Sequence, residues 1–243
     1  MAALVGPAIV NVGGLPLLFA AHGGWMLACA ALLALVVPSI SAGKAIPLSI
    51  GDIMRRHVAI YRSAQVSAAA WGWLFYTLTF VAGLTVLPEF LSPKDAILFL
   101  AAAPILSIVF SLSFGVLLLR YTTAIGVVVI GFALALVATV GLILLPGMVW
   151  VPIALFCVLG LVQGASFAAI PQLNTNDNDR ALATGALAQT GNIGNLVGTP
   201  LLLAAADFAG LSGVVLFLLL AYCGGLLVHL ILASVRRRQL LAS

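Results

Sequence analysis

Apolar residues follow one another in long runs along this chain, and short polar segments separate the runs. A helix needs about 20 mostly apolar residues to cross the hydrocarbon layer of a membrane, which is about 30 Å thick. No run shows the sustained alternation typical of a membrane β-strand. Turn-forming residues at 21–24, 92–95, 145–147 and 173–180 mark breaks between runs. The pattern predicts an all-α integral membrane protein with eight spans, at 3–20, 25–40, 66–90, 96–119, 124–145, 150–172, 181–205 and 211–235.

Composition narrows the class of protein further. Hydrophobic residues make up 64% of the 243 residues and charged residues only 7%, against about 25% charged residues in a soluble domain. A soluble chain of this size cannot bury so much apolar surface. A soluble enzyme, a nucleic-acid-binding protein and a disulfide-rich secreted domain are therefore excluded. Cys29, Cys157 and Cys223 are scattered through apolar runs, so we predict neither a metal site nor a cofactor.

Basic residues test the predicted layout, because they concentrate on the cytoplasmic side of a membrane protein. With eight spans and both termini in the cytoplasm, the outer segments contain only Lys94 of the ten basic residues. The inner segments contain the other nine, which are Lys44, Arg55, Arg56, Arg62, Arg120, Arg180, Arg236, Arg237 and Arg238. We therefore predict a multi-pass protein of the cell membrane, and its alanine and glycine content favours a bacterial inner membrane.

The longest polar segment, 42–65, contains a predicted amphipathic helix at Ser49–Arg62. Its apolar residues share one face, because they recur at helical spacing: Ile50, Ile53, Met54, Val58 and Tyr61. Ser49 and Asp52 are spaced as a capping box at its start. The segment is interpreted either as a linker that rests in the lipid headgroup layer or as a regulatory, lipid-sensing element.

Glycine, proline and polar residues cluster inside two stretches of the apolar sequence. The first contains Gly6-Pro7, Gly13-Gly14 and His22-Gly23-Gly24-Trp25; the second contains Arg180-Ala181, Gly185, Gln189, Gly191-Asn192, Gly194-Asn195, Gly198-Thr199-Pro200 and Asp207-Phe208-Ala209-Gly210. Both stretches resemble parts of major facilitator superfamily transporters, which have twelve spans in two six-span halves. Nearly the whole chain is similar to the last eight of those spans.

The resemblance implies an organisation and a function. Residues 1–41 would form two spans from the end of an N-terminal half, 42–65 the cytoplasmic linker, 66–235 a six-helix C-terminal half and 236–243 a basic cytoplasmic tail. Secondary active or facilitative transport of a small solute by alternating access is the implied function. The alternative is a truncated or accessory eight-span subunit without transport activity of its own. A missing N-terminal half, or a second copy in a homodimer, would then complete the transporter.

Polar side chains inside the predicted spans are the candidate solute contacts, because polar groups in a bilayer need a partner or water. Gln189 and Asn192 are three residues apart and share a helix face, with Asn195 further round. Gly194 and Gly198, like Gly160 and Gly164, are spaced for close helix contact. We predict solute contacts at Gln189, Asn192, Gln163, Tyr76, Thr77 and Asn11. The alternative is that these side chains bind neighbouring helices.

Charged and titratable side chains give fewer candidates. Gly115 and Arg120 match a cytoplasmic loop motif of the family, although Leu119 replaces its acid; Arg120 is either a gating residue or a solvated charge. Glu89, near the outer end of its span, is the candidate for proton coupling. His229 is the only histidine within a span and is interpreted mainly as a packed side chain. We predict no enzyme activity, because nucleophile-elbow and phosphate-loop motifs are lacking.

Overall fold

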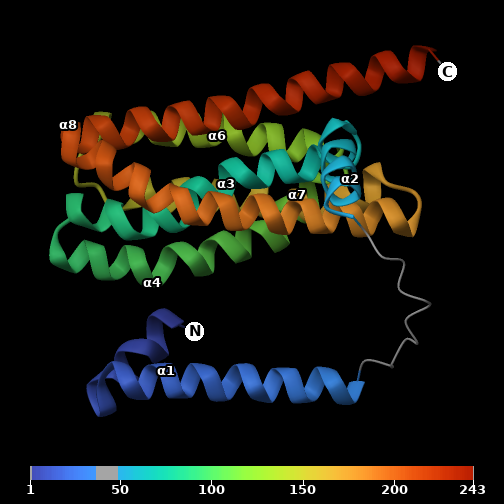
Figure 1. The fold of residues 1–243 in the computed structure, drawn as a ribbon. Helices are drawn as coiled ribbons and strands as arrows, with labels where there is room; N and C mark the ends of the chain where they lie inside the picture. The colour runs from blue at the N-terminus through green and yellow to red at the C-terminus, as the bar shows by residue number, and fades with distance from the viewer. Residues whose placement is uncertain (1, 37–48, 243) are drawn as a thin grey trace. The chain divides into compact units, whose positions relative to one another are not determined.

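A computed structural model describes residues 2–36 and 49–242, and these residues are almost entirely helical, without a strand (Figure 1). The predicted domain boundary at 41–42, the end of the predicted second span and Lys44 lie outside the described residues. The helices are α1 (Ala2–Val36), α2 (Ile50–Arg62), α3 (Ala68–Val86), α4 (Pro93–Phe110), α5 (Val116–Leu118), α6 (Ala124–Leu144), α7 (Trp150–Leu173) and α8 (Asp177–Ala242). A 3-10 turn, η1 (Leu87–Phe90), follows α3, and a π-turn, η2 (Ser111–Gly115), follows α4.

Six helices in the described part of the chain are long and apolar enough to cross a membrane. The described residues are helical without a strand, which confirms the all-α prediction, and the six long apolar helices fit the predicted multi-pass membrane protein. The longest, α8, is interrupted at Ala209 and Gly210, where Gly210 has a φ of 57°. The chain reverses there, so α8 consists of a first arm, 177–208, and a second arm, 211–242 (Figure 1). The break lies where the sequence separates its last two apolar runs.

The N-terminal helix departs from the predicted layout. We expected a turn at Ala21–Gly24 between two spans, but these residues are helical. The break lies instead at Gly13 and Gly14, where Gly14 has a φ of 67°. Pro16 follows, and proline is favoured at a helix start because it has no backbone N–H to leave unbonded. Residues 8–36 therefore give one candidate span, and the count of eight spans is not confirmed.

Two compact units make up the chain, Met1–Ile53 and Met54–Ser243. In the second unit, α3 packs along α8 and α7, α6 packs against α7 and α8, and α4 packs against α7. Its core contains a line of aromatic rings in which Phe156 contacts Phe80 and Phe99, with centroid distances of 4.8 and 5.2 Å. Burial of such rings excludes lipid and water and fixes the bundle.

Glycines allow the closest helix contacts in this unit. A Cβ atom on Gly194 would lie 2.8 Å from the Leu74 carbonyl oxygen and from the Leu78 backbone nitrogen of α3. A Cβ on Gly160 would likewise meet the backbone of Ser107 in α4. The glycine spacings in the sequence therefore correctly indicated close helix contact. In membranes, where lipid is as apolar as leucine, such close packing is a main source of helix association.

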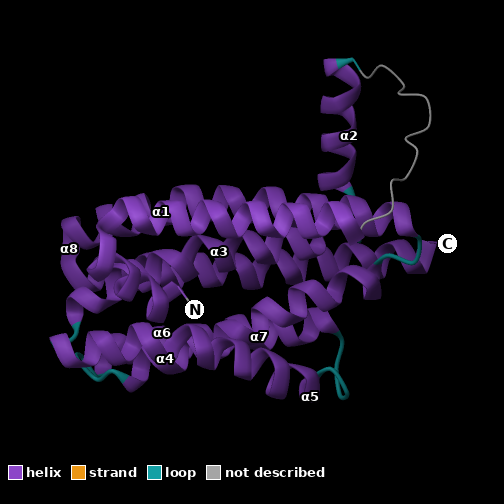
Figure 2. Ribbon diagram, turned by 90° about the horizontal axis from the view of Figure 1, so that it is seen from below, coloured by secondary structure: helices purple, strands orange, loops and turns teal. Residues whose placement is uncertain are grey.

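The amphipathic helix forms as the sequence indicated, one residue shorter than predicted. Ser49 caps α2 by accepting a hydrogen bond from the Asp52 amide (3.1 Å), and Asp52 accepts one from the Ser49 amide (3.3 Å). This is the reciprocal capping box. The helix runs crosswise to the long helices of the second unit (Figures 1 and 2).

Candidate functional site

The first arm of α8 presents a line of exposed amide side chains, Gln189, Asn192 and Asn195. We call these three residues the amide face. Among the described residues, Asn192 and Asn195 have no hydrogen-bond partner for their side chains. An amide moved from water into hydrocarbon without a partner costs about 4–8 kcal/mol. The amide face of a membrane-spanning helix must therefore meet water, a polar solute or a polar partner.

Gln189 is already engaged by the amphipathic helix. The Tyr61 hydroxyl donates to Gln189 Oε1 at 3.0 Å, and Gln189 Nε2 lies 2.9 Å from His57 Nε2. Burial raises the pKa of the Tyr61 phenol above its ordinary value of 10, so this hydroxyl remains a donor at neutral pH. Nε2 of a neutral imidazole accepts the hydrogen bond when the amide nitrogen donates.

This contact was missed from the sequence. His57 and Tyr61 are four residues apart and so share one face of α2, but that spacing gives no sign of which helix they meet. Tyr61 also contacts the Trp71 ring edge-on, at 5.8 Å between centroids. The structure therefore joins a predicted solute contact to the predicted linker helix.

Aromatic side chains from α3 and α7 border the same arm. A Cβ on Gly191 would lie 2.5 Å from Trp73 Nε1, so the indole packs on the α8 backbone. The Trp73 ring stacks on Tyr76 at 4.7 Å and meets Phe167 of α7 edge-on at 4.9 Å. Phe167 is 49% exposed. Its place beside Trp73 could not be predicted, because nothing in the sequence distinguishes it from other apolar residues of its span.

Tyr76 and Thr77, two predicted solute contacts, lie inside the helix bundle. They are 4% and 5% exposed. The Thr77 hydroxyl donates to the Trp73 carbonyl of its own helix at 2.9 Å and faces Gly194. In this conformation both side chains belong to the contact between α3 and its neighbours, and their role as solute contacts stays a prediction.

The remaining candidates are dispersed. Gln163 is half-buried on α7, and Asn11 is exposed on α1 in the first unit. Arg120 is exposed in the turn after α5, whereas Glu89 is exposed in η1 at the other end of α4. Arg120 and Glu89 thus lie at opposite ends of the bundle. The gating and proton-coupling roles of these two residues stay predictions.

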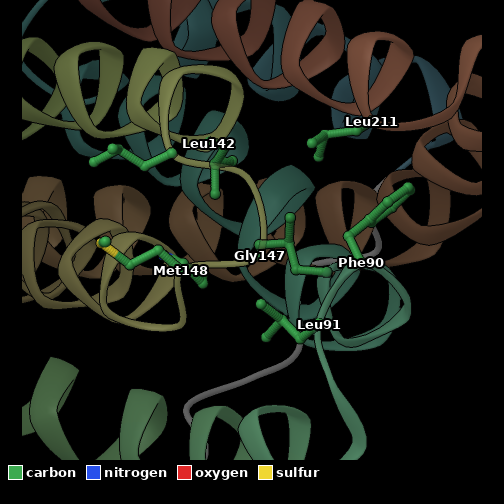
Figure 3. A pocket seen from close by; sticks show the side chains of 9 residues that line it. Phe90, Leu91, Leu142, Gly147, Met148 and Leu211 are labelled. Atoms are coloured by element: carbon green, nitrogen blue, oxygen red, sulfur yellow. The ribbon is translucent and has the colours of Figure 1, made fainter.

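One hollow in the second unit lies away from all these residues. Its apolar lining includes Phe90, Leu142 and Leu211, near the end of the bundle that carries Glu89 (Figure 3). Its cavity volume of about 20 Å³ accommodates about one water molecule. This hollow is too small for a solute. The described residues contain no cluster of three or more histidine, cysteine or acidic side chains that could hold a metal ion.

His229 is the second polar feature of α8. Its side chain is 0% exposed, and neither ring nitrogen has a hydrogen-bond partner within the described part of the chain. The imidazole packs against Gly72 of α3 and lies 6.3 Å, between ring centroids, from Phe132 of α6. It is therefore packed among three helices, as its sequence context favoured.

Comparison with models of known protein families gives no match, and a search of curated proteins finds no relative of this chain.

Proposed function

We propose that this protein moves a small solute across a membrane by alternating access, as a secondary active or facilitative transporter of the major facilitator type. The amide face is the observation that carries the proposal. It places hydrogen-bonding groups on the exposed side of a helix that is otherwise long and apolar enough to span a bilayer. Such groups are stable in a membrane where they line an aqueous cavity.

The irregular helices support the same proposal. Pro104 lies inside α4, the π-turn η2 follows α4, and Pro171 lies inside α7 near its end. Proline removes a backbone hydrogen bond, and π-turns displace the following residues round the helix. Transporters use such interrupted helices around solute sites that open alternately to the two sides.

A second function fits the same amide face. An accessory subunit would use Asn192 and Asn195 to bind polar groups of a partner protein, since amides also join membrane helices. The two functions differ in whether water reaches the face, and on which sides of the membrane it does so.

The reactivity of a single introduced cysteine distinguishes the transporter from the accessory subunit. Cys29, Cys157 and Cys223 are replaced by alanine, and a single cysteine is introduced as Asn192→Cys in the full chain. Leu220→Cys, an exposed apolar position on the second arm, is the matched control. A membrane-impermeant thiol reagent is applied to right-side-out and inside-out vesicles, because only a thiolate in water reacts with it.

Transport predicts that Asn192→Cys reacts from both sides and that Leu220→Cys reacts from neither. A transported solute, found by screening a panel of neutral and zwitterionic compounds, would slow the reaction at Asn192→Cys only. Reaction from one side alone contradicts alternating access. Absence of reaction from both sides favours the accessory function.

A further inference from the structure

The amphipathic helix α2 lies at the arginine-rich end of the second unit. Arg236 of the second arm of α8 donates to the Ala64 carbonyl oxygen, just beyond α2, at 2.9 Å. Arg120, in the turn after α5, and Arg180, in the first turn of α8, lie at the same end of the unit. Because α2 runs crosswise to the spanning helices (Figures 1 and 2), it lies along the plane of the membrane surface when those helices cross the bilayer.

The second-unit part of α2 has two distinct faces. His57 and Tyr61 bind Gln189, and Ile60 packs on a core cluster with Val66 and Ala183. On the other side, Met54 is 60% exposed and Val58 is 46% exposed. A shallow groove follows these two side chains, and its lining is Met54, Arg55, Val58, Ala59 and Arg62. The outward face thus combines apolar side chains with two guanidinium groups.

The charge around this groove is positive. Arg55 and Arg62 are seven residues apart, about 10 Å along the helix axis, and so share one side of it. The described residues at this end contain three aspartates, Asp52, Asp177 and Asp179. Asp177 pairs with Arg180 at 3.5 Å, and Asp179 accepts from Asn176 at 2.7 Å. Seven arginines with described side chains lie at the same end and outnumber these aspartates: Arg55, Arg62, Arg120, Arg180, Arg236, Arg237 and Arg238.

We propose that the groove formed by Met54, Arg55, Val58, Ala59 and Arg62 binds an anionic phospholipid of the adjacent leaflet. The two guanidinium groups bind the phosphate and headgroup oxygens, while Met54 and Val58 enter the acyl boundary beneath them. Arginine suits this role because its planar guanidinium forms paired hydrogen bonds with phosphate. An amphipathic helix with basic residues binds anionic bilayers through both apolar burial and charge.

Bound lipid has a consequence for the amide face. The same helix that meets the lipid donates the Tyr61 hydrogen bond to Gln189. A lipid that holds α2 at the surface therefore also stabilises the contact between α2 and the first arm of α8. This inference concerns lipid binding and does not depend on whether the protein transports a solute.

Amide hydrogen exchange of the full chain in lipid nanodiscs tests the proposal. The discs contain phosphatidylcholine alone, or phosphatidylcholine with phosphatidylglycerol. Exchange in residues 54–62 is expected to slow by about tenfold in the anionic discs, since an anionic surface attracts each nearby arginine. The double variant Arg55→Gln/Arg62→Gln is expected to lose this protection.

Arg237→Gln/Arg238→Gln is the matched control, because it removes the same charge from exposed positions at the same end. It should retain the protection of α2. Exchange in α6 and α7 reports whether each variant remains folded. Should the first double variant unfold, native mass spectrometry of the wild-type protein decides instead, with retention of phosphatidylglycerol over phosphatidylcholine expected.

Three results would overturn the proposal. They are equal exchange of α2 in both kinds of disc, equal loss of protection in the two double variants, and protection that appears in native membranes but not in anionic discs. The second result would show a diffuse charge effect, and the third would show that a protein covers the groove. Equal retention of the two lipids in mass spectrometry would also contradict it.

Discussion

The first arm of α8 has two faces of opposite character. On one face, Gly191, Gly194 and Gly198 bring α3 within backbone contact. On the other, Gln189, Asn192 and Asn195 are exposed, and only Gln189 has a side-chain partner among the described residues. The glycine face holds the bundle together, whereas the bundle forms without using Asn192 or Asn195.

This difference separates residues that the bundle uses for packing from exposed polar residues that the bundle does not use. Glycine is unfavourable in a helix interior by about 1 kcal/mol relative to alanine, so the glycines have to be compensated by packing. Exposed amides in a bilayer are unfavourable as well, and no packing in the described structure compensates Asn192 and Asn195. Their compensation must come from outside the bundle, from water, a solute or a partner.

The largest change in the free energy of unfolding is expected when a side chain is added on the glycine face, which is formed by Gly191, Gly194 and Gly198. Gly194→Ala would place a Cβ 2.8 Å from two backbone atoms of α3, which cannot move without shifting the helix. We expect a loss of about 2–3 kcal/mol in the free energy of unfolding. Gly185→Ala is the control on the same arm, since its Cβ would have no atom within 4 Å. Thermal unfolding of the purified variants measures both. Equal unfolding temperatures for the two would show that α3 and α8 do not pack closely.

Replacing the buried His229 on the second arm should raise the free energy of unfolding, whereas filling the glycine face should lower it. His229→Leu removes two buried ring nitrogens that lack partners in the described structure, while it keeps most of the side-chain volume. We expect a gain of about 1–2 kcal/mol in the free energy of unfolding, because an unsatisfied buried group costs about 1–3 kcal/mol. His229→Ala, which leaves a cavity, should be less stable than the leucine variant. A destabilised His229→Leu protein would contradict this expectation.

Removing the hydrogen bond between α2 and Gln189 should have a smaller effect on stability, and this effect should be confined to α2. Tyr61→Phe removes the donor of the 3.0 Å hydrogen bond but keeps the ring that contacts Trp71. We expect amide exchange in α2 to quicken by about fivefold, as for the loss of about 1 kcal/mol. Tyr121→Phe, at an exposed position, is the control and should leave α2 unchanged. Unaltered exchange in Tyr61→Phe would mean that other contacts hold the helix.

The smallest change in stability is expected at the amide face itself. Asn192→Ala should leave the free energy of unfolding within about 0.5 kcal/mol of wild type, as for other exposed substitutions. The same variant should lose binding or transport of the solute found by the accessibility screen. A loss of stability comparable to that of Gly194→Ala would instead identify Asn192 as part of a helix contact, and would contradict the separation of the two faces.

Much of the fold could be predicted, because membrane solvation acts residue by residue. The apolar runs located the helices of the second unit within a few residues, except that the second arm of α8 continues to residue 242, beyond its predicted end at 235. Glycine spacing located the close contacts at Gly160 and Gly194. The break in α1 was predicted at Ala21–Gly24 but lies at Gly13–Gly14. Glycine pairs occur at both places, and local sequence alone did not decide which pair would leave the helix.

The candidate site was harder to predict, because it depends on contacts between distant residues. The sequence identified Gln189 and Asn192 as polar positions on one helix face, but the partners His57 and Tyr61 lie 132 and 128 residues away from Gln189. Tyr76 and Thr77 carry polar groups like the exposed candidates. Nothing in their spacing shows that Thr77 would satisfy its hydroxyl within its own helix and face Gly194.

The sequence by itself determined that the chain forms long apolar helices suited to a membrane, where most of these helices run, and which residues are polar within them. These properties follow from the cost of placing each side chain and each backbone group in hydrocarbon, which neighbours in the fold hardly change. Only the tertiary structure decided which of those polar residues are covered. Burial depends on which helices meet and on which sides they meet, so Thr77 became part of a helix contact, Gln189 a partner of α2, and Asn192 an exposed group.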